Sequence, residues 1–412
     1  MSMDIRQEQF STERSAEIGA AWLAAVEADL DHALDLRRRI HSSPNLGGQE
    51  QATAEVIEAE LSPFMSLDTI AGTGRIGRIG PADGPAVGIR AELDALPGEE
   101  ATGADFASTN GAMHACGHDV HMATLVAVIR AIPELGERTG QALPTALAAV
   151  FQPREESYPS GALDIVSEKG LEKASIARMI GVHNHPGVPL GQVAIGEGYI
   201  NAAADEVHIT VHGRGGHGAY PHNASDPVAA VANVALSLPE IVRRTIGPMS
   251  AAVVSVGTMS VGDGAGNVLP RHGSIRATVR TTSAQERKDI QAAIGTMARR
   301  IAQAYGLEAD VAIIDGEPVL INDSDLARRF ATQAQGLGAS VASPMRSLGA
   351  DDFSFFSEAV PSAMSFVGTG QPQASLHNAG YLPPERSVLD VARAMIAGYL
   401  AGAESILGSG SE

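Results

Sequence analysis

The segment from His114 to His121, with the sequence HACGHDVH, gathers three histidines around the only cysteine of the 412-residue chain. Thiolate and imidazole are the ligands that borderline-soft divalent ions such as zinc prefer. In the Cys116-Gly117-His118 step, glycine gives the backbone the freedom that lets both side chains turn toward one point. We interpret the segment as half of a metal site. The alternative is a buried thiol beside surface histidines.

The elements that would position such a site are short apolar runs separated by helical patterns. We predict strands at Ala86–Ala91, Thr145–Phe151 and Ala177–Val182, with a long helix from about Asp119 to Leu135 between the first two. Strands that alternate with helices indicate a largely parallel sheet covered on its faces. The expected fold class is therefore α/β, with a mixed and mostly parallel sheet in the domain that carries these strands.

Polar side chains follow each of these predicted strands. Asp94 comes after the first strand, Glu155 and Glu156 after the second, and His183 after the third. Ligands of open α/β sheets bind outside the carboxyl ends of the strands, so we expect these groups to converge. An exposed acidic pair in a loop is the alternative for the two adjacent glutamates.

Helical spacing continues at both ends of the chain. We predict one helix from Glu13 to His41, ending before Pro44, and a second from Gln51 to Leu61. A last helix from about Arg386 to Leu407 should pack back on the first domain and leave Gly408–Glu412 as a loose tail.

The residue pattern of roughly 198–320 differs from that of the flanking segments. It predicts a strand, a helix, two strands, a helix and a strand, at residues 206–212, 226–246, 251–261, 274–281, 284–305 and 309–314. That order is typical of a ferredoxin-like unit, which can be inserted as a second domain. We therefore predict a metal-binding domain over 1–197 and 321–412, and an inserted second domain over 198–320.

The composition of the chain argues against some classes of binding partner. The formal net charge is −19 and the sequence pI is about 5.1, without a basic stripe, which argues against nucleic acid and anionic membranes. The first residues contain no apolar signal region, and no segment reaches the roughly 18 to 20 apolar residues of a membrane span. A single cysteine gives no sign of an oxidising compartment, so we expect a cytoplasmic protein.

Several segments together resemble a known family, the zinc- or manganese-dependent amidohydrolases. These include aminoacylases, hippurate hydrolases and indole-acetyl-amino-acid hydrolases, relatives of carboxypeptidase G and other co-catalytic metallopeptidases. The segments are RAELDALP (90–97), MHACGHDVH (113–121), FQPREE (151–156), GVHNHP (181–186), GRGGHGAYPH (213–222), NVLP (267–270) with Arg280, and SLGADDFSFF (347–356) with Leu376-His377-Asn378. The resemblance covers nearly the whole chain.

The resemblance implies a two-metal site. Its ligands fall on Cys116, His118, Glu156, His183 and His377. Two zinc or manganese ions, with cobalt or nickel as further options, would share a water and polarise the scissile carbonyl.

Other residues take supporting roles by the same resemblance. Glu155 would be the general base, and Asp94 and Asp119 would orient ligands. His217 would reach the active site of a partner subunit and stabilise the tetrahedral oxyanion, which implies that the inserted domain is a lid and forms a homodimer. Asn267 and Arg280 would bind the substrate. The alternatives are a capping role for His217 in its glycine-rich turn, and an outward-facing strand position for Arg280.

The chain departs from the family pattern at several places. Glu92 and Asn45 stand where the family usually has aspartate and glutamate, and Asp351 stands where it often has glutamate. The loop Ser157–Ser160 replaces the usual glycines, so it can reshape the substrate pocket.

The expected function is metal-dependent hydrolysis of the amide bond of N-acyl amino acids or similar small amides. One alternative on the same scaffold is hydrolytic deamination of an aromatic or heterocyclic amine, although the signature of the zinc deaminases is absent. A catalytically inert, metal-containing binding protein is a third possibility, and such a protein would not need Glu155.

Overall fold

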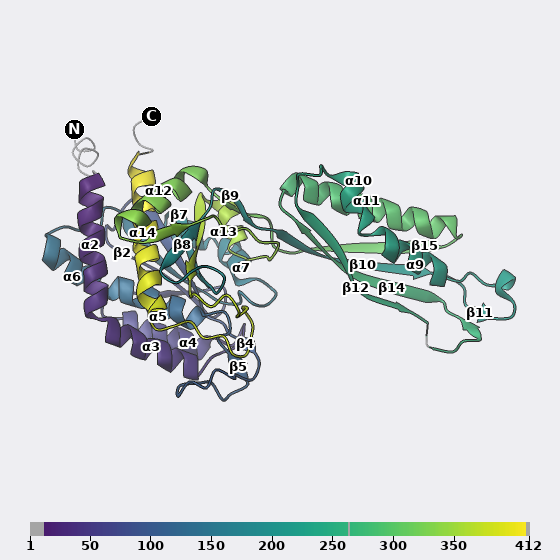
Figure 1. Ribbon diagram of the computed structural model, residues 1–412, viewed down its shortest axis with the longest axis horizontal. Helices are drawn as coiled ribbons and strands as arrows, with labels where there is room; N and C mark the ends of the chain where they lie inside the picture. Colours follow the sequence, from purple (N-terminus) through teal and green to yellow (C-terminus); the bar gives the residue numbers. More distant parts are fainter. Residues whose placement is uncertain (1–11, 263, 409–412) are drawn as a thin grey trace. The chain divides into compact units, whose positions relative to one another are not determined.

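The computed structural model describes residues 12–262 and 264–408 of the chain and divides it into two compact units (Figure 1). The first unit runs to Ile200 and also contains Ile321–Met345 and the chain from Phe355 onward. The second unit consists of Asn201–Leu320 and Arg346–Ser354. Among the described residues, no helix combines the length and the apolar character that crossing a bilayer requires.

The first unit is built on an eight-stranded sheet with the order β1-β2-β6-β3-β7-β18-β8-β17. Its strands are β1 (Asp68–Ile70), β2 (Gly74–Ile79), β3 (Ala86–Glu92), β6 (Ala146–Gln152), β7 (Ile176–His185), β8 (Gln192–Ile195), β17 (Ser340–Ala342) and β18 (Ser362–Gly368). The four neighbours β6, β3, β7 and β18 are mutually parallel, whereas β2 and β8 run antiparallel to their inner neighbours. The predicted mixed, mostly parallel α/β sheet is confirmed.

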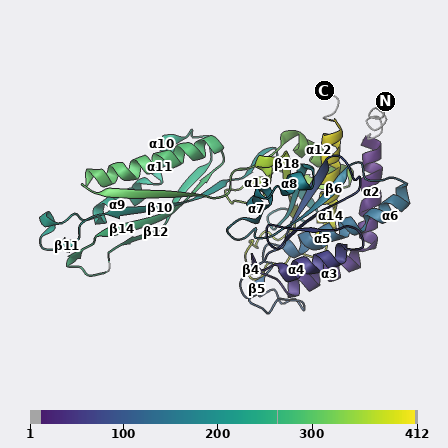
Figure 2. The same cartoon turned by 180° about the vertical axis from the view of Figure 1, so that it is seen from behind.

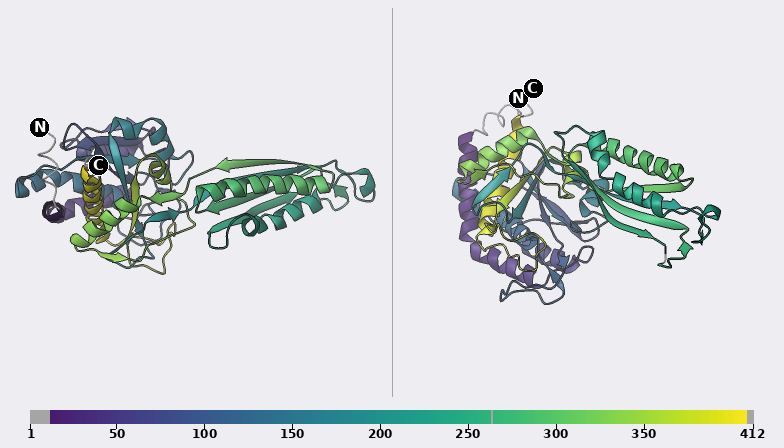
Figure 3. Two further views of the ribbon diagram at one scale, coloured as in Figure 1. Left: turned by 90° about the horizontal axis from the view of Figure 1, so that it is seen from above. Right: turned by 45° about the vertical axis from the view of Figure 1, so that its right-hand side comes forward.

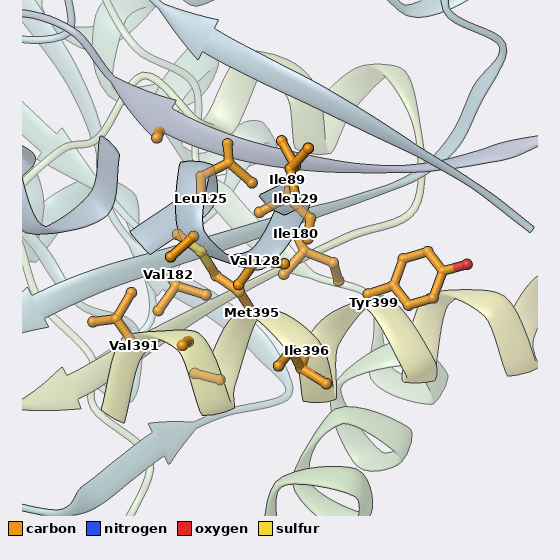
Figure 4. Packing of buried hydrophobic residues seen from close by; sticks show 14 of the residues in the cluster. Ile89, Leu125, Val128, Ile129, Ile180, Val182, Val391, Met395, Ile396 and Tyr399 are labelled. Atoms are coloured by element: carbon orange, nitrogen blue, oxygen red, sulfur yellow. The ribbon is translucent and has the colours of Figure 1, made fainter. Parts of the chain in front are cut away.

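Helices cover this sheet and make its core. They are α2 (Thr12–Ala28), α3 (Leu30–Ser42), α4 (Gln51–Leu61), α5 (His118–Arg130), α6 (Ile132–Thr139), α7 (Gly161–Ser167), α8 (Gly170–Lys173), α12 (Ser324–Gly336), α13 (Ser354–Ala359) and α14 (Ser387–Gly408). Helices α5 and α14 pack on β3 and β7 and on each other. Figure 4 shows Met395 of α14 lying among Val128, Ile180 and Val182.

Two glycines of α14 let this helix approach the sheet. A Cβ atom on Gly398 would lie 2.5 Å from Cγ2 of Ile180, and one on Gly402 would lie 2.8 Å from both methyl carbons of Val87. Both distances are too short for real side-chain contacts, so the helix–sheet packing depends on glycine at these turns. The predicted return of the last helix to the first domain is thereby explained.

Three predicted helices are each two helices in the structure. The predicted Glu13–His41 helix is interrupted at Asp29, where the backbone leaves the helical region with φ −106° and ψ 18°. The predicted 119–135 helix is interrupted at Ala131, and the predicted 226–246 helix ends at Ser237 and restarts at Glu240. Pro133 and Pro239 stand at the two restarts, because proline lacks the N–H that a continuing helix needs and suits a first turn. The predicted 408–412 tail is also shortened: Gly408 still belongs to α14, and 409–412 lie outside the described residues.

The second unit is a four-stranded antiparallel sheet covered by helices. Its strands are β10 (Ala203–His212), β12 (Ala252–Val261), β14 (His272–Thr281) and β15 (Glu308–Asp315), in the order β12-β14-β10-β15. Helices α9 (Val228–Ser237), α10 (Glu240–Thr245) and α11 (Ala284–Ala304) pack on one face, and α11 runs along the sheet (Figures 2 and 3). Chain order and strand order together are those of a ferredoxin-like fold, as the sequence predicts.

Local sequence accounts for this second unit. Buried Val207, Ile209 and Val211 alternate along β10, which leaves the other face of that strand to polar side chains. Ser283 begins α11 as its N-cap, with its hydroxyl accepting a hydrogen bond from the Glu286 amide. The alternation with a period of two in the strands and this Ser-x-x-Glu start of the helix allow the elements of the second unit to be predicted from the sequence.

Candidate metal centre

The proposed ligands of the first segment lie where a loop turns into helix α5. Gly117 has a left-handed backbone conformation, with φ 84°, and is followed directly by His118, the first residue of the helix. A Cβ atom at Gly117 would meet the Asn184 side-chain nitrogen at 3.0 Å and Pro383 at 3.1 Å. The left-handed backbone and the close neighbours both require glycine between Cys116 and His118, in agreement with the role predicted for Gly117 from the sequence.

Five side chains named by the resemblance meet in the first unit. Donor atoms lie within 4.8 Å of one another in the groups Cys116, His118, His183 and Cys116, Glu156, His377. Sγ of Cys116 is 3.4 Å from Nε2 of His183, and Nε2 of His377 is 3.2 Å from Oε1 of Glu156. The two groups have the cysteine in common, so their five donor residues form one continuous cluster.

Hydrogen bonds fix which nitrogen each imidazole offers. Nδ1 of His118 donates to the Asp94 carbonyl oxygen at 2.9 Å, and Nδ1 of His183 donates to the Asn184 carbonyl oxygen at 2.6 Å. In the neutral form of each ring, Nε2 therefore keeps its lone pair for the cluster. Nε2 of His118 is buried and makes no hydrogen bond to any residue that the structure describes. A bound cation would satisfy this atom, so the residues present fit a metal.

Burial and neighbouring charges shift the pKa of these groups. Burial lowers the pKa of His183 far below its ordinary value, and the adjacent His121 adds to the effect, which keeps His183 neutral and able to ligate. Burial likewise raises the pKa of the Cys116 thiol, and the carboxylates of Glu156 and Glu155 add to it. Forming the thiolate therefore needs a compensating positive charge, which a divalent ion supplies.

The two adjacent glutamates occupy different positions. Glu156 belongs to the Cys116 group, whereas Oε2 of Glu155 lies 3.9 Å from Nε2 of His118 in a second group formed by His118, Glu155 and Glu156. Burial raises the pKa of Glu156, but His377 and His118 outweigh burial and bring it below its ordinary value. Glu156 is therefore an ionised carboxylate available to a cation.

Asp94 orients the glutamate segment rather than the reacting atoms. Its Oδ2 accepts a hydrogen bond from the Glu156 amide at 2.9 Å, and burial raises its pKa to about 6. Through its backbone carbonyl Asp94 also fixes the ring of His118. We therefore regard Asp94 as a positioning residue for two of the proposed ligands.

Asp119 supports the site through a buried ion cluster that the sequence did not reveal. Its Oδ2 accepts hydrogen bonds from Nε of Arg37 at 2.8 Å and from Nδ1 of His41 at 3.0 Å. Arg37 also donates to the Pro383 carbonyl oxygen at 2.7 Å. The carboxylate thus anchors the start of α5 to helix α3 and to the chain before α14, instead of orienting an imidazole of the cluster.

Replacing Arg37 by methionine should destabilise the first unit strongly. The Arg37 and Asp119 side chains are 2% and 0% exposed, so the substitution leaves a buried carboxylate with His41 as its remaining partner. Breaking such a pair from one side costs about 3 to 5 kcal/mol of unfolding free energy. Chemical denaturation followed by the fluorescence of Trp22, the single tryptophan, measures this loss because that ring is fully buried in the first unit.

Arg38→Met is the matched control for that measurement. Arg38 is the next residue along the helix, and its partners Asp35 and Glu385 are exposed. Exposed ion pairs contribute little, so this variant should unfold close to wild type. Equal shifts for both variants would contradict the role assigned to the buried pair.

The other site residues predicted from the sequence, His217, Asn267 and Arg280, lie in the second unit. His217 belongs to β11 (Gly216–His217), which pairs with β13 (Val268–Leu269), and the Gly218 amide donates to the Asn267 carbonyl oxygen at 2.8 Å. Nδ1 of His217 accepts from the Ala219 amide at 3.1 Å, so a neutral ring carries its proton on Nε2. His217 and Asn267 are exposed and adjacent.

Arg280 lies far from these two residues within the same unit. It pairs with Ala204 at the start of β10, whereas the far end of β10, where His212 pairs with His272, leads to the β11 loop. The register separates the two ends by eight residues, from 204 to 212. At about 3.3 Å per strand residue this is roughly 26 Å, more than a small substrate spans.

One prediction about strand ends is wrong in detail. His183 does not follow its strand, because β7 extends to His185 and carries His183 within it. Conversely, Glu92 ends β3 as a fully buried residue, and His121, for which the sequence suggested no role, contacts it at 2.9 Å. Glu92 and His121 are twenty-nine positions apart in the sequence, so only the tertiary structure reveals this contact.

The fold and the donor set define the class of metallohydrolases built on an α/β sheet with an inserted ferredoxin-like unit. Residues 88–400 match the model of peptidase family M20/M25/M40, and the chain belongs to this family. It is 32% identical over 351 residues to the N-acetyl-L-cysteine deacetylase of Bacillus subtilis, covering 84% of this chain and 82% of the relative. It is 34% identical over 361 residues to the IAA-amino acid hydrolase ILR1-like 4 of Arabidopsis thaliana, covering 84% and 80%.

A solved structure agrees with both the fold and the metal chemistry. A Bacillus subtilis protein described as a dinuclear metal binding peptidase from the M20 family matches with a TM-score of 0.78 and 28% identity, covering 91% of this chain and 98% of that protein. The chain is thus a hydrolase of a family with dinuclear members, as its sequence motifs indicated.

Proposed function

We propose that this chain is a two-metal amidohydrolase that cleaves the amide bond of N-acyl amino acids, with Glu155 as general base. The observation that carries the proposal is the pair of donor groups sharing Cys116, with Glu155 beside them and outside both. Relatives named as a deacetylase of N-acetyl-L-cysteine and as a hydrolase of IAA-amino acids support the substrate class.

Each proposed residue has one task. Cys116, His118, Glu156, His183 and His377 hold the ions, for which zinc or manganese suits the mixture of donors best and cobalt or nickel fits as well. When bound, two divalent ions would supply Lewis acidity and lower the pKa of a coordinated water. Glu155 takes the proton of that water and later delivers it to the leaving nitrogen.

The second unit completes the site in this proposal. His217 donates from Nε2 to the oxygen that becomes negative in the tetrahedral intermediate, and Asn267 binds beside it. Arg280 pairs with the amino-acid carboxylate. Because roughly 26 Å of strand separates Arg280 from His217, the two residues of one chain cannot serve one small substrate. The proposal therefore requires a homodimer in which His217 and Asn267 serve the partner's site.

Amine release from a panel of N-acetyl, N-benzoyl and indole-acetyl amino acids tests this function. Chelator-stripped protein should be inactive, and addition of zinc or manganese should restore release of the free amino acid from at least one member of the panel. Glu155→Gln loaded with the same metal is the matched blank for traces of other hydrolases. Silence of the folded, metal-loaded wild type across the panel would overturn the proposed substrate class.

A further inference from the structure

The backbone of Asn184, the residue that follows the proposed ligand His183, is held at both its N–H and its carbonyl oxygen. The Asn184 N–H, which belongs to the peptide group between His183 and Asn184, donates to Nε2 of His121 at 3.0 Å. The Asn184 carbonyl oxygen accepts from Nδ1 of His183 at 2.6 Å. This oxygen belongs to the next peptide group, between Asn184 and His185. Because its bond to Nδ1 sets the tautomer and the ring orientation of His183, whatever holds the backbone at Asn184 also positions the proposed ligand.

His121 can accept the Asn184 N–H only in one tautomer. With Nε2 as acceptor, the neutral ring carries its proton on Nδ1, which lies 2.9 Å from Oε2 of Glu92 and donates to it. Both nitrogens of His121 are thereby committed. Although Glu92, His118 and His121 bring donor atoms within 4.8 Å of one another, this engagement favours orientation over metal ligation for His121.

Glu92 is in turn held by buried groups on the sheet. Nη1 of Arg90 donates to its Oε1, and Nε of Arg90 donates to the side-chain oxygen of Gln152 at 2.9 Å. Arg90, Glu92, His121 and Gln152 are all 0% exposed. A hydrogen-bonded row thus runs from β6 through β3 to α5 and ends at the Asn184 N–H of β7.

Asn184 also reaches the other ligand segment. Its side-chain nitrogen donates to the Gly117 carbonyl oxygen at 3.4 Å, between Cys116 and His118. The rings of His121 and His183 have centroids 4.9 Å apart, and those of His121 and His118 are 5.7 Å apart. The row therefore ends beside both proposed imidazole ligands.

We propose that Glu92 and His121 are positioning residues: through the Asn184 backbone they hold His183 with Nε2 directed at the other proposed ligands. This inference rests on the proposed metal function, but the geometry it describes exists before any ion binds. Glu92 stands where the family usually has aspartate, and its extra methylene sets how far the carboxylate reaches toward His121.

The test compares His121→Leu with His121→Gln. Leucine removes the acceptor for the Asn184 amide, whereas the glutamine side-chain oxygen can take the place of Nε2. In metal-free protein, hydrogen exchange at the Asn184 amide should accelerate at least tenfold in the leucine variant. Zinc affinity, measured by competition with a chelating indicator, should fall about 10- to 100-fold, and glutamine should recover a large part of both.

Ile129→Ala is the matched control, because Ile129 is a fully buried residue of the same helix outside the row. Loss of its side chain should leave the Asn184 amide and zinc affinity near wild type. If the leucine variant does not fold, Glu92→Asp replaces it, with faster exchange and weaker zinc binding expected because the shorter side chain withdraws from Nδ1.

Two results would overturn the inference: wild-type exchange and zinc affinity in the leucine or aspartate variant, or the same losses in Ile129→Ala. Failure of the proposed metal function has a different signature. In that case wild-type protein would bind no zinc, while the exchange rates at Asn184 would still separate the variants.

Discussion

Glu155→Gln should retain its metal and lose amide hydrolysis by about 10²- to 10⁴-fold, the range that general acid–base catalysis contributes. Glutamine keeps the size of the side chain and can accept a hydrogen bond, but it cannot take a proton from water at neutral pH. Because Glu155 lies outside the two donor groups that share Cys116, the ions should stay bound. Turnover on a substrate from the panel and metal content by elemental analysis measure both halves of this expectation.

Glu156→Gln is the control that separates the base from a ligand. Glu156 contacts His377 and belongs to the group with Cys116, so its neutral replacement should lower metal content together with turnover. Unchanged turnover in Glu155→Gln would remove that residue as the base. Equal metal loss in both variants would show that the adjacent carboxylates do not divide their tasks.

The fold of this chain is visible in its sequence because periodicity and topology agree. The buried strand β3 begins with the apolar run Ala86–Ile89, and the ferredoxin-like unit follows from alternation in β10 and the capped start of α11. The interruptions of the predicted helices are harder to predict from the sequence. A single proline such as Pro133 or Pro239 ends one helix and starts another without disturbing the apolar spacing on either side.

The candidate site could be predicted only in part, for a physical reason. Ligand types and motifs identify Cys116 and His118, because both belong to one short segment whose glycine has a local purpose. The partners of Asp119 and His121 could not be identified in this way, since Arg37 and Glu92 lie 82 and 29 positions away. Only tertiary packing brings such charged residues together, so a local sequence pattern does not predict these contacts.

His217→Ala should lower turnover by about 10²- to 10³-fold without loss of metal, as removal of one oxyanion donor does. Within the second unit, His217 presents a ring whose Nδ1 is occupied by the Ala219 amide, so a neutral ring offers Nε2–H as a donor. Alanine removes that donor and leaves every proposed ligand in place. A rise of KM alone, with kcat unchanged, would contradict stabilisation of the intermediate.

Mixing His217→Ala with Glu155→Gln protein then decides whether the histidine acts across a dimer. In a mixed dimer of the two variants, one site would combine an intact Glu155 with an intact His217 from the partner, while the other would lack both. After subunit exchange, random pairing puts half of the molecules in mixed dimers, so about a quarter of all sites should regain wild-type turnover. Each variant mixed with itself is the control. If complete exchange restores nothing, His217 acts within its own chain, and the roughly 26 Å of strand between Arg280 and the His212 end of β10 would exclude Arg280 from the same substrate.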